Sequence, residues 1–409
     1  MRNSFPKYVQ RNLYYNFFDV FFLFIKLFLS GQIVHGKQTA SFCTFLQEKY
    51  RCIVLPTGSG RLAITLFLRA MQKRGECNNV LLPFYICPSV PDAVVAAGFR
   101  PVFLPIRNDL TLDPDSITED ACARAAAIII PHPYGYPASI DILVERIRSF
   151  NPDIAILDDA AAGYNVSYRG QLLGTFGDAG VLSFSQGKLL NATGGGALLL
   201  FNQSMKADVV RQYEQLPSIS ARDKTREFFR VLWRFGCHRF SDPLMYWFGK
   251  VYPHKDSFSM PLGKMSNLDA AVAMASLPKL ASVHARRSAI IRRYVAAFSG
   301  RQDIVLPQEL IDGIPPVNRF YISIPSCRLV LGEHANIVQH NPLYLFLRQQ
   351  GVKAYYPYLP VKRFVSDYGQ YWNEASWLYS LVGLPVDFKR APHQHDYVIE
   401  QVLSFVERL

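Results

Sequence analysis

A lysine and an acidic pair stand at a spacing that suits one kind of covalent chemistry. The apolar run 154–157 ends in Asp158 and Asp159, and Lys188 follows Asp159 by 29 residues. A lysine amine can form a Schiff base with the aldehyde of pyridoxal 5'-phosphate (PLP). A carboxylate at the end of a buried strand can keep the pyridine nitrogen of PLP protonated, so that the ring withdraws electrons. The spacing therefore predicts a PLP-dependent enzyme in which Lys188 and one of the two aspartates are catalytic.

A turn rich in glycine and serine is a candidate for binding the phosphate of the cofactor. Gly58 and Ser59 follow the apolar run 53–56 and precede a helical pattern at 62–73. Backbone N–H groups and the positive end of the helix dipole favour a phosphate at such a turn. Many strand-to-helix turns need glycine only for its conformational freedom, so this motif alone is weak evidence.

Short apolar runs alternate with helical patterns from about residue 50 onward. The runs lie at 53–56, 80–82, 101–106, 126–130, 154–157, 180–185 and 196–201. Because they are continuously apolar, they predict an α/β protein whose parallel or mixed sheet is covered on both faces by helices. Ligands of such sheets bind beyond the carboxyl ends of the strands, where Asp159, Ser183 and the Gly58 turn fall.

Composition narrows the class of protein further. The chain has 409 residues, half of them apolar, which is enough for two domains with substantial cores. Seven scattered cysteines without a C-x-x-C pair indicate a reducing, cytoplasmic environment. The net charge of +12 favours phosphorylated substrates, anionic lipid or nucleic acid, but no nucleic-acid module is recognisable. His393 and His395 lack further ligands in a metal-binding pattern, so we expect exposed loop residues and no metal site.

Several motifs follow one another in the order of a known family. They are Thr57-Gly58-Ser59, Pro131-His132-Pro133-Tyr134-Gly135-Tyr136-Pro137-Ala138, Asp158-Asp159-Ala160-Ala161, Gly174-Thr175-Phe176-Gly177-Asp178, Ser183-Phe184 with Lys188, and Met265-Ser266-Asn267-Leu268-Asp269-Ala270-Ala271. They resemble the S-G-T, H-L-Y-G-x-P-A, E-D-A-A, G-T-F-G-D, lysine and M-S-E-x-Q-A-A segments of the DegT/StrS family of PLP-dependent sugar aminotransferases. The resemblance runs from about Ser30 to the C-terminus. Any one segment is ordinary, but the ordered set is specific.

This resemblance implies the roles of the site residues. Lys188 would bind the cofactor and move a proton between it and the substrate, Asp159 would pair with the pyridine nitrogen, and Gly58, Ser59 and Ser183 would bind the phosphate. The implied enzyme is a homodimer with sites at the subunit interface. It takes an amino group from a donor, plausibly glutamate, and passes it to a keto group of a sugar, a nucleotide-linked or lipid-linked sugar, or a related polar acceptor.

The resemblance also implies the fold-type I architecture of aspartate aminotransferase. A large three-layer α/β/α domain with a mostly parallel central sheet, residues 41–280, would bind the cofactor. A smaller α+β domain, residues 281–409, would close over the site. Residues 1–40 form an aromatic amphipathic segment in this scheme, and an aromatic and basic insertion occupies about 204–260.

Three positions depart from the family pattern. Ala162 stands where the family usually has Gln or His beside the phenolic oxygen of the cofactor, and cannot donate that hydrogen bond. Cys87 replaces a ring-stacking aromatic residue, with a soft thiol that covers less of the cofactor ring. Leu262 replaces an asparagine that reaches the phosphate of the neighbouring subunit. Lys264 could replace that asparagine electrostatically, by bringing a point charge to the phosphate.

The predicted enzymatic activity gives no role to two aromatic segments, 12–29 and 226–250. The first has a wide aromatic face on a helix, and the second repeats arginine every four residues beside aromatic side chains. Packing of the two segments on each other or across a dimer interface is one interpretation. The other is an interfacial patch that holds the enzyme peripherally at the anionic inner face of the membrane, where it meets a lipid-linked or amphiphilic substrate.

Two other functions compete with the aminotransferase. A PLP-dependent dehydratase shares the scaffold, but in this family that chemistry often accompanies loss of the lysine that is present here as Lys188. A catalytically inactive, membrane-associated binding or scaffold protein is consistent with the substitutions at Cys87, Ala162 and Leu262.

Overall fold

The computed structural model describes residues 17–72, 77–185, 187–236, 263–306, 319–332, 337–360, 364–387 and 389–409. Its centre is a seven-stranded sheet in the order β1-β9-β8-β5-β4-β2-β3. The strands are β1 (Ile53–Thr57), β2 (Asn79–Pro83), β3 (Arg100–Leu104), β4 (Ala125–Pro131), β5 (Ala155–Asp159), β8 (Ala179–Ser183) and β9 (Gly196–Leu200). Each of the seven apolar runs in the sequence therefore contributes one strand.

Most of the sheet is parallel, as the sequence predicts. The strands β3, β2, β4, β5 and β8 run in one direction, whereas β9 is antiparallel to both of its neighbours, β8 and β1. The carboxyl ends of β1, β4, β5 and β8 therefore meet at one edge of the sheet. That edge is where a ligand of such a sheet is expected to bind.

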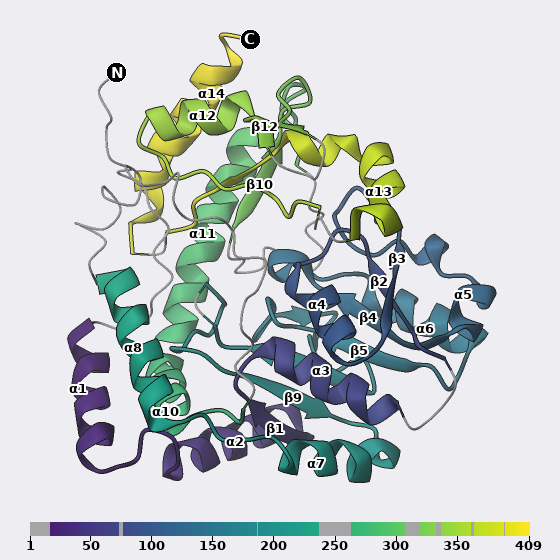
Figure 1. Ribbon diagram of the computed structural model, residues 1–409. Coiled ribbons are helices and arrows are strands. Elements are labelled where there is room, and N and C mark those ends of the chain that lie inside the picture. Colours follow the sequence, from purple (N-terminus) through teal and green to yellow (C-terminus); the bar gives the residue numbers. More distant parts are fainter. Residues whose placement is uncertain are drawn as a thin grey trace.

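Helices cover both faces of the sheet (Figure 1). The first face packs on α3 (Gly60–Met71), α4 (Ser89–Ala96) and α7 (Lys206–Glu214). The second face packs on α2 (Lys37–Tyr50), α6 (Ile140–Phe150) and α10 (Asn267–Ser276), with the short α5 (Glu119–Ala123) beside α6. Successive strand residues alternate between the two cores: Ile129 lies in the first, and Ile128 and Ile130 lie in the second. The result is the three-layer α/β/α arrangement.

The C-terminal part of the chain adds helices and two small antiparallel sheets. The strand β10 (Phe320–Ser323) pairs with β13 (Leu381–Leu384), and β11 (Val330–Leu331) pairs with β12 (Ile337–Gln339). The helices are α11 (Leu280–Phe298), α12 (Pro342–Gln349), α13 (Val365–Glu374) and α14 (Asp396–Val406). The long α11 starts at the predicted boundary near residue 280 and passes from the sheet layers to this part (Figure 1). The boundary itself stays a prediction.

Two helices from distant parts of the sequence lie side by side at one end of the molecule (Figure 1). The helix α1 (Phe17–Leu29) falls within the predicted segment 12–29, and α8 (Ala221–Gly236) lies within the predicted insertion. The rings of Phe24 and Phe228 stack with centroids 4.2 Å apart. Residues 1–16 and 237–262 lie outside the described residues, and so does most of the predicted segment 226–250.

Candidate active site

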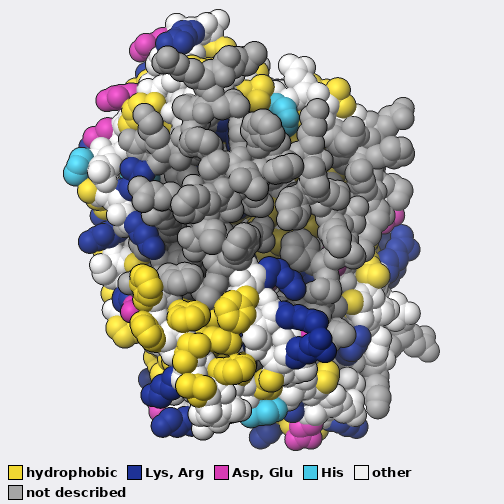
Figure 2. All heavy atoms as spheres, turned by 60° about the vertical axis from the view of Figure 1, so that its left-hand side comes forward, with side chains coloured by type: hydrophobic (Ala, Val, Ile, Leu, Met, Phe, Trp, Pro, Cys, Tyr) yellow, Lys and Arg dark blue, Asp and Glu magenta, His cyan; other side chains and the backbone are white. Residues whose placement is uncertain are grey.

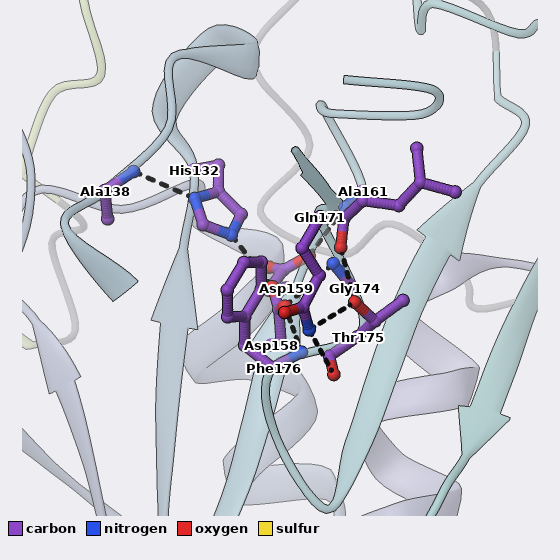
Figure 3. A network of polar contacts seen from close by, with 10 residues as sticks. His132, Ala138, Asp158, Asp159, Ala161, Gln171, Gly174, Thr175 and Phe176 are labelled. Carbon is purple, nitrogen blue, oxygen red and sulfur yellow. Dashed lines mark hydrogen bonds and ion pairs between the residues drawn. The ribbon is translucent and has the colours of Figure 1, made fainter. Parts of the chain in front are cut away.

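The two adjacent aspartates at the end of β5 have different environments. Asp158 is fully buried and Asp159 keeps 6 % of its surface exposed. Oδ2 of Asp158 accepts hydrogen bonds from the backbone N–H groups of Gly174 (2.7 Å) and Phe176 (3.1 Å) (Figure 3). The same carboxylate contacts His132 through Oδ1 at 2.8 Å. Asp158 is therefore engaged within the fold, as the alternation of side chains along a strand requires.

His132 completes the surroundings of Asp158. Its Nδ1 accepts the backbone N–H of Ala138 at 3.0 Å, so this nitrogen carries no proton. Nε2 must then carry the proton of the neutral ring and donate it to Asp158. Because both ring nitrogens are hydrogen-bonded within the fold and the side chain is buried, His132 has a structural role.

Only one of the two carboxylate oxygens of Asp159 accepts a hydrogen bond from the described residues. Its Oδ1 accepts the backbone N–H of Ala161 at 3.0 Å (Figure 3). Among the residues that the structure describes, none donates to the other oxygen. Burial raises the pKa of the Asp159 carboxyl; the Ala161 N–H, Lys188 and His132 oppose that rise without cancelling it. A buried carboxylate that lacks a second donor is suited to binding a cationic or N–H group from a ligand.

Lys188 lies on the turn between β8 and β9. Its backbone N–H donates to Ser185 (3.2 Å), and the following residues Leu189 and Leu190 are buried and anchor the turn. The lysine side chain is half-buried, and its positive charge lowers the pKa of Asp159. The structure thus brings the predicted amine and carboxylate to the same edge of the sheet.

The amino end of α3 meets the end of β8. Ser59 caps α3 by accepting the N–H of Leu62 (3.2 Å), so its hydroxyl proton is not used by the cap. A Cβ placed on Gly60 would lie 3.0 Å from Cβ of Ser183, so the turn packs directly on that serine. The first N–H groups of a helix have no acceptor within the helix. This arrangement of N–H groups, two serines and a helix dipole suits a phosphate.

The backbone groups of Gly58 form hydrogen bonds with other parts of the chain. Its N–H donates to the carbonyl of Gly263 (2.8 Å), and its carbonyl accepts the N–H of Gly195 (3.1 Å). Its backbone groups are therefore used within the fold, and its N–H is not available to a phosphate. A contact between Gly58 and the phosphate therefore stays a prediction; within the described residues, Gly58 fixes the turn that presents Ser59 and Gly60.

Two of the departures from the family pattern lie beside this edge. Cys87 is half-buried, with Sγ 3.1 Å from Oγ of Ser89. The carbonyl of Ala162 would lie 2.9 Å from a Cβ placed on Gly135, which has a φ of +100°. The chain beyond β4 therefore runs close to the loop after Asp159, and only glycine fits there.

Lys264 is only partly where the sequence places it. Its backbone forms a bridge with Thr57, next to the Ser59 turn. Its ammonium, however, lies over the Tyr213 ring at 5.0 Å and donates to the carbonyl of Glu214 at 3.5 Å. Within one chain, the Lys264 charge is thus held at the end of α7. A contact with the phosphate of a neighbouring subunit stays a prediction.

Sequence reasoning missed a buried ionic network behind the lysine turn. Nζ of Lys224 donates to Asp269 (2.7 Å) and to Glu227 (3.0 Å). Asp269 also accepts the hydroxyls of Thr193 (2.5 Å) and Ser266 (2.7 Å). The network joins α8 and α10 to the turn that ends at β9. A sequence pattern could not reveal it, because Lys224 lies in the stretch without a counterpart in the family motifs.

The two C-terminal histidines also differ from expectation. His393 is exposed, but His395 is fully buried. Nδ1 of His395 lies 2.9 Å from the Tyr294 hydroxyl, and Nε2 lies 3.3 Å from the Asp387 carbonyl. The prediction of exposed loop residues is therefore wrong for His395, which joins α11 to the start of α14.

These observations can now be compared with known proteins. The sequence matches the model of the DegT/DnrJ/EryC1/StrS aminotransferase family over residues 24–403. The chain belongs to this family. The resemblance seen in the ordered motifs is thereby confirmed.

Relatives and solved structures agree with this family. The erythromycin biosynthesis sensory transduction protein EryC1 of Saccharopolyspora erythraea is 30% identical over 44% of this chain and 50% of its own length. The dTDP-3-amino-3,4,6-trideoxy-alpha-D-glucose transaminase of Streptomyces venezuelae is 26% identical over 72% of this chain and 68% of its own length. The matches thus span between half and about two thirds of these relatives.

Among solved structures, PseC of Helicobacter pylori, an aminotransferase involved in pseudoaminic acid biosynthesis, aligns with a TM-score of 0.73 at 15% identity. It covers 99% of this chain and 100% of PseC. A sugar aminotransferase of Streptococcus pneumoniae, solved in its PLP-form, has a TM-score of 0.72 at 19% identity and covers 99% of this chain and 98% of its own. The fold is therefore that of these aminotransferases.

Proposed function

We propose that this chain is a PLP-dependent aminotransferase that moves an amino group from an amino-acid donor, first of all glutamate, to a keto group of a sugar or a related polar acceptor. The family supports the reaction class, and relatives named as sugar transaminases support the acceptor class. The observation in the structure that carries the proposal is Asp159, whose open oxygen lies at the same sheet edge as Lys188 and the Ser59–Ser183 turn.

The described residues fit the cofactor. Asp159 would hold the protonated pyridine nitrogen with the oxygen that no protein N–H occupies. The hydroxyls of Ser59 and Ser183 would hold the phosphate at the positive end of α3. Cys87 and Ala162 would lie beside the cofactor ring, and the Cys87 thiol would pack on it. When bound, the cofactor supplies an electron sink that stabilises negative charge on the substrate carbon.

The chain's own residues then have distinct tasks. Lys188 would hold the cofactor through its aldehyde, and the lysine amine would accept and return a proton at the substrate carbon. Asp158 and His132 keep the strand end in place, because their hydrogen bonds occupy the Asp158 carboxylate and both ring nitrogens. Asp159 can thus face the cofactor while its neighbour holds the fold.

Half-reactions test this proposal without knowledge of the acceptor. The purified protein is loaded with PLP, and L-glutamate should bleach its visible absorbance band in one turnover with formation of 2-oxoglutarate. Sugars with a keto group are then screened for return of the band. A folded protein that binds no PLP would refute the enzyme and support the inactive scaffold. Release of water from a sugar without any amine transfer would support the dehydratase.

A homodimer is the second part of the proposal. Members of this architecture place their sites at the subunit interface, and Lys264 would reach the partner's phosphate only by turning from the end of α7. Sedimentation at several protein concentrations tests the oligomeric state. Loss of PLP affinity in Lys264→Ala together with an unchanged dimer would support a role for Lys264 across the interface.

We also propose that the enzyme binds peripherally to the anionic cytoplasmic face of a membrane. Aromatic and aliphatic side chains are exposed on α1 and α8, among them Phe22 at 67 % and Leu29 at 79 %. Figure 2 shows hydrophobic side chains gathered on this face, with basic side chains beside them. The further members of the patch are Phe18, Phe28 and Phe229, and the exposed cations on the same two helices are Lys26, Arg222, Arg226 and Arg230.

This combination suits an interfacial surface. Its basic residues would face lipid headgroups and its aromatic residues would enter the acyl boundary. Within the described residues, no helix is both long and apolar enough to cross a bilayer. Any membrane binding by these residues would therefore take place at the surface.

Flotation with vesicles that contain phosphatidylglycerol tests this second proposal. The wild type should float with anionic vesicles, and Phe22→Ser/Leu29→Ser should remain at the bottom. Val95→Ser is a matched control, since Val95 is an exposed aliphatic residue on α4, in a different part of the molecule. A PLP-loaded protein that never floats would exclude membrane binding. A wild type that dimerises and does not float, together with a double variant that stays monomeric, would indicate that a second copy covers this surface instead.

A further inference from the structure

A cluster of tyrosines surrounds an arginine where the C-terminal part meets the carboxyl edge of the sheet. The guanidinium carbon of Arg319, just before β10, lies 4.4 Å from the ring centroid of Tyr355. The rings of Tyr134 and Tyr321 have centroids 4.5 Å apart, and Tyr358 stacks on Tyr134 at 4.9 Å. The cluster joins the segment after β4 to two segments of the C-terminal part.

Hydrogen bonds fix these rings. The hydroxyls of Tyr85 and Tyr134 lie 2.8 Å apart, and the N–H of Tyr358 points at both, at 3.4 and 3.3 Å. The hydroxyl of Tyr321 donates to the carbonyl of Tyr356 at 2.9 Å. The rings therefore form a preorganised wall, which reduces the entropy lost when a ligand binds.

The positive charge of Arg319 has no counterion in this wall. Among the residues that the structure describes, no carboxylate pairs with its guanidinium. Burial raises the pKa of Tyr85, Tyr134 and Tyr358 well above the usual range, so these hydroxyls are neutral at pH 7. Burial lowers the pKa of the Arg319 guanidinium, but Tyr321 and Tyr355 outweigh burial and leave that pKa raised, so the side chain stays cationic. Its forked donors, which no described carboxylate occupies, are suited to an anion.

The cluster adjoins the lysine turn. Tyr134 immediately precedes Gly135, where an added Cβ would lie 2.9 Å from the Ala162 carbonyl and 3.7 Å from Cδ1 of Leu189. Leu189 follows Lys188 in the chain. The Cys87 thiol contributes to the raised pKa of Tyr358, second to burial, so that tyrosine also lies near the cofactor edge. A ligand on Arg319 would therefore be within the active site.

We propose that Arg319 and the tyrosines around it form an anion subsite of the active site, which binds an oxyanion of a substrate. This inference rests on the proposed aminotransferase function and extends it to the substrate class. The forked donors of a guanidinium match both a carboxylate and a phosphate. The oxyanion is therefore either a carboxylate of the amino donor or a phosphate of the acceptor.

Calorimetry separates the two sources. The PLP-loaded wild type is titrated with glutarate, a dicarboxylate without an amine, and separately with dTDP. Loss of a charge-assisted hydrogen bond predicts that Arg319→Gln binds the relevant probe on the order of 10- to 100-fold more weakly. Arg319→Lys should recover part of the affinity. Arg293→Gln is the matched control, because Arg293 lies on α11, exposed and paired with Asp396.

Each outcome is decisive. Weaker glutarate binding assigns the subsite to the donor, and a matching rise in the KM of L-glutamate at nearly constant kcat should accompany it. Weaker dTDP binding assigns it to the acceptor. The inference is overturned if neither probe binds the wild type, or if Arg319→Gln binds both as the wild type does. Failure of the proposed function is distinguishable, since the visible band of bound PLP would then be absent in the wild type itself.

Discussion

Two pairs of lysine and aspartate in this chain use the same charges in opposite ways. Lys224 and Asp269 are both buried and lie 2.7 Å apart, with further hydrogen bonds from Thr193 and Ser266. Lys188 and Asp159 share an electrostatic interaction, but within the described chain they form no direct ion pair. The first pair is complete without a ligand, and the second is not.

The difference shows how a structural ion pair and a binding site can be told apart in one molecule. Burial lowers the pKa of the Lys224 ammonium, but attraction by Asp269 and Glu227 outweighs that effect and leaves it raised. The pKa of Asp159 is also raised, but there burial wins over its partners. In these two pairs, the ammonium of Lys224, whose charge the protein stabilises, serves the fold, whereas the Asp159 carboxylate, whose charge burial destabilises, can gain stability from a bound ligand.

The largest expected effect is on catalysis by Lys188. We expect Lys188→Ala to slow glutamate-dependent bleaching by about four orders of magnitude or more, because both the covalent and the proton-transfer roles are lost. Its free energy of unfolding should stay close to that of the wild type, since the side chain forms no ion pair within the described residues. Rapid-mixing absorbance and urea unfolding measure the two quantities. Lys279→Ala serves as the control, because Lys279 is an exposed lysine between α10 and α11 whose ammonium lies 3.8 Å from the Asp19 carboxylate. A strongly destabilised Lys188→Ala would contradict the comparison.

The second-largest expected effect is a loss of stability when the Lys224–Asp269 pair is broken. Asp269→Asn leaves the buried Lys224 ammonium without its nearest counterion, so we expect a loss of about 3 to 5 kcal/mol in the free energy of unfolding. The double variant Lys224→Met/Asp269→Asn has no such unpaired charge and should regain a large part of that loss. Urea unfolding of the two variants and the wild type measures this. Equal destabilisation of the single and double variants would show that the hydrogen bonds, and not the ionic charges, stabilise the network.

In contrast to Asp269→Asn, Asp159→Asn should lower the activity without lowering the stability. The amide still accepts the Ala161 N–H but cannot hold a protonated pyridine nitrogen, so we expect bleaching by L-glutamate to slow by about 100-fold or more. Without PLP, the variant should be as stable as the wild type or more stable, because a destabilised buried carboxylate has been removed. Calorimetric unfolding of the PLP-free proteins decides this. A PLP-free variant less stable than the wild type would mean that Asp159 is a structural residue like Asp158.

The sequence alone predicts one of these two pairs. Lys188 and Asp159 follow recognisable runs, and a parallel sheet brings strand ends together, so their spacing along the chain translates into proximity. The seven strands were predictable for the same reason. Lys224 and Asp269 lie 45 residues apart on two helices, and nothing in a helical pattern says that their faces meet.

Backbone hydrogen bonding sets another limit to prediction. Gly58 stands in a turn of the expected composition, yet its N–H is used by Gly263, from a segment more than 200 residues away. His395 lies in a short polar stretch, but packing of α11 against the start of α14 buries it. In both cases, long-range contacts decide which polar groups remain available to a ligand.

The smallest expected effect is the pH dependence of the two pairs. In the PLP-free protein the pKa of Asp159 lies above its ordinary value, so the folded state holds a proton that the unfolded state has released. The free energy of unfolding should therefore fall as the pH rises from the ordinary pKa of an aspartate to the raised one, and then level off. The pKa of Lys224 is raised as well, but its contribution persists below the ordinary lysine pKa and is lost only in alkali. Burial lowers the pKa of His284 and of His395 to about 4, so the wild type and Asp159→Asn should both gain stability as the pH rises toward the ordinary histidine pKa. Unfolding of both proteins measured from roughly pH 4 to 8 should therefore show the decline in the difference between them, because the asparagine has no proton to release.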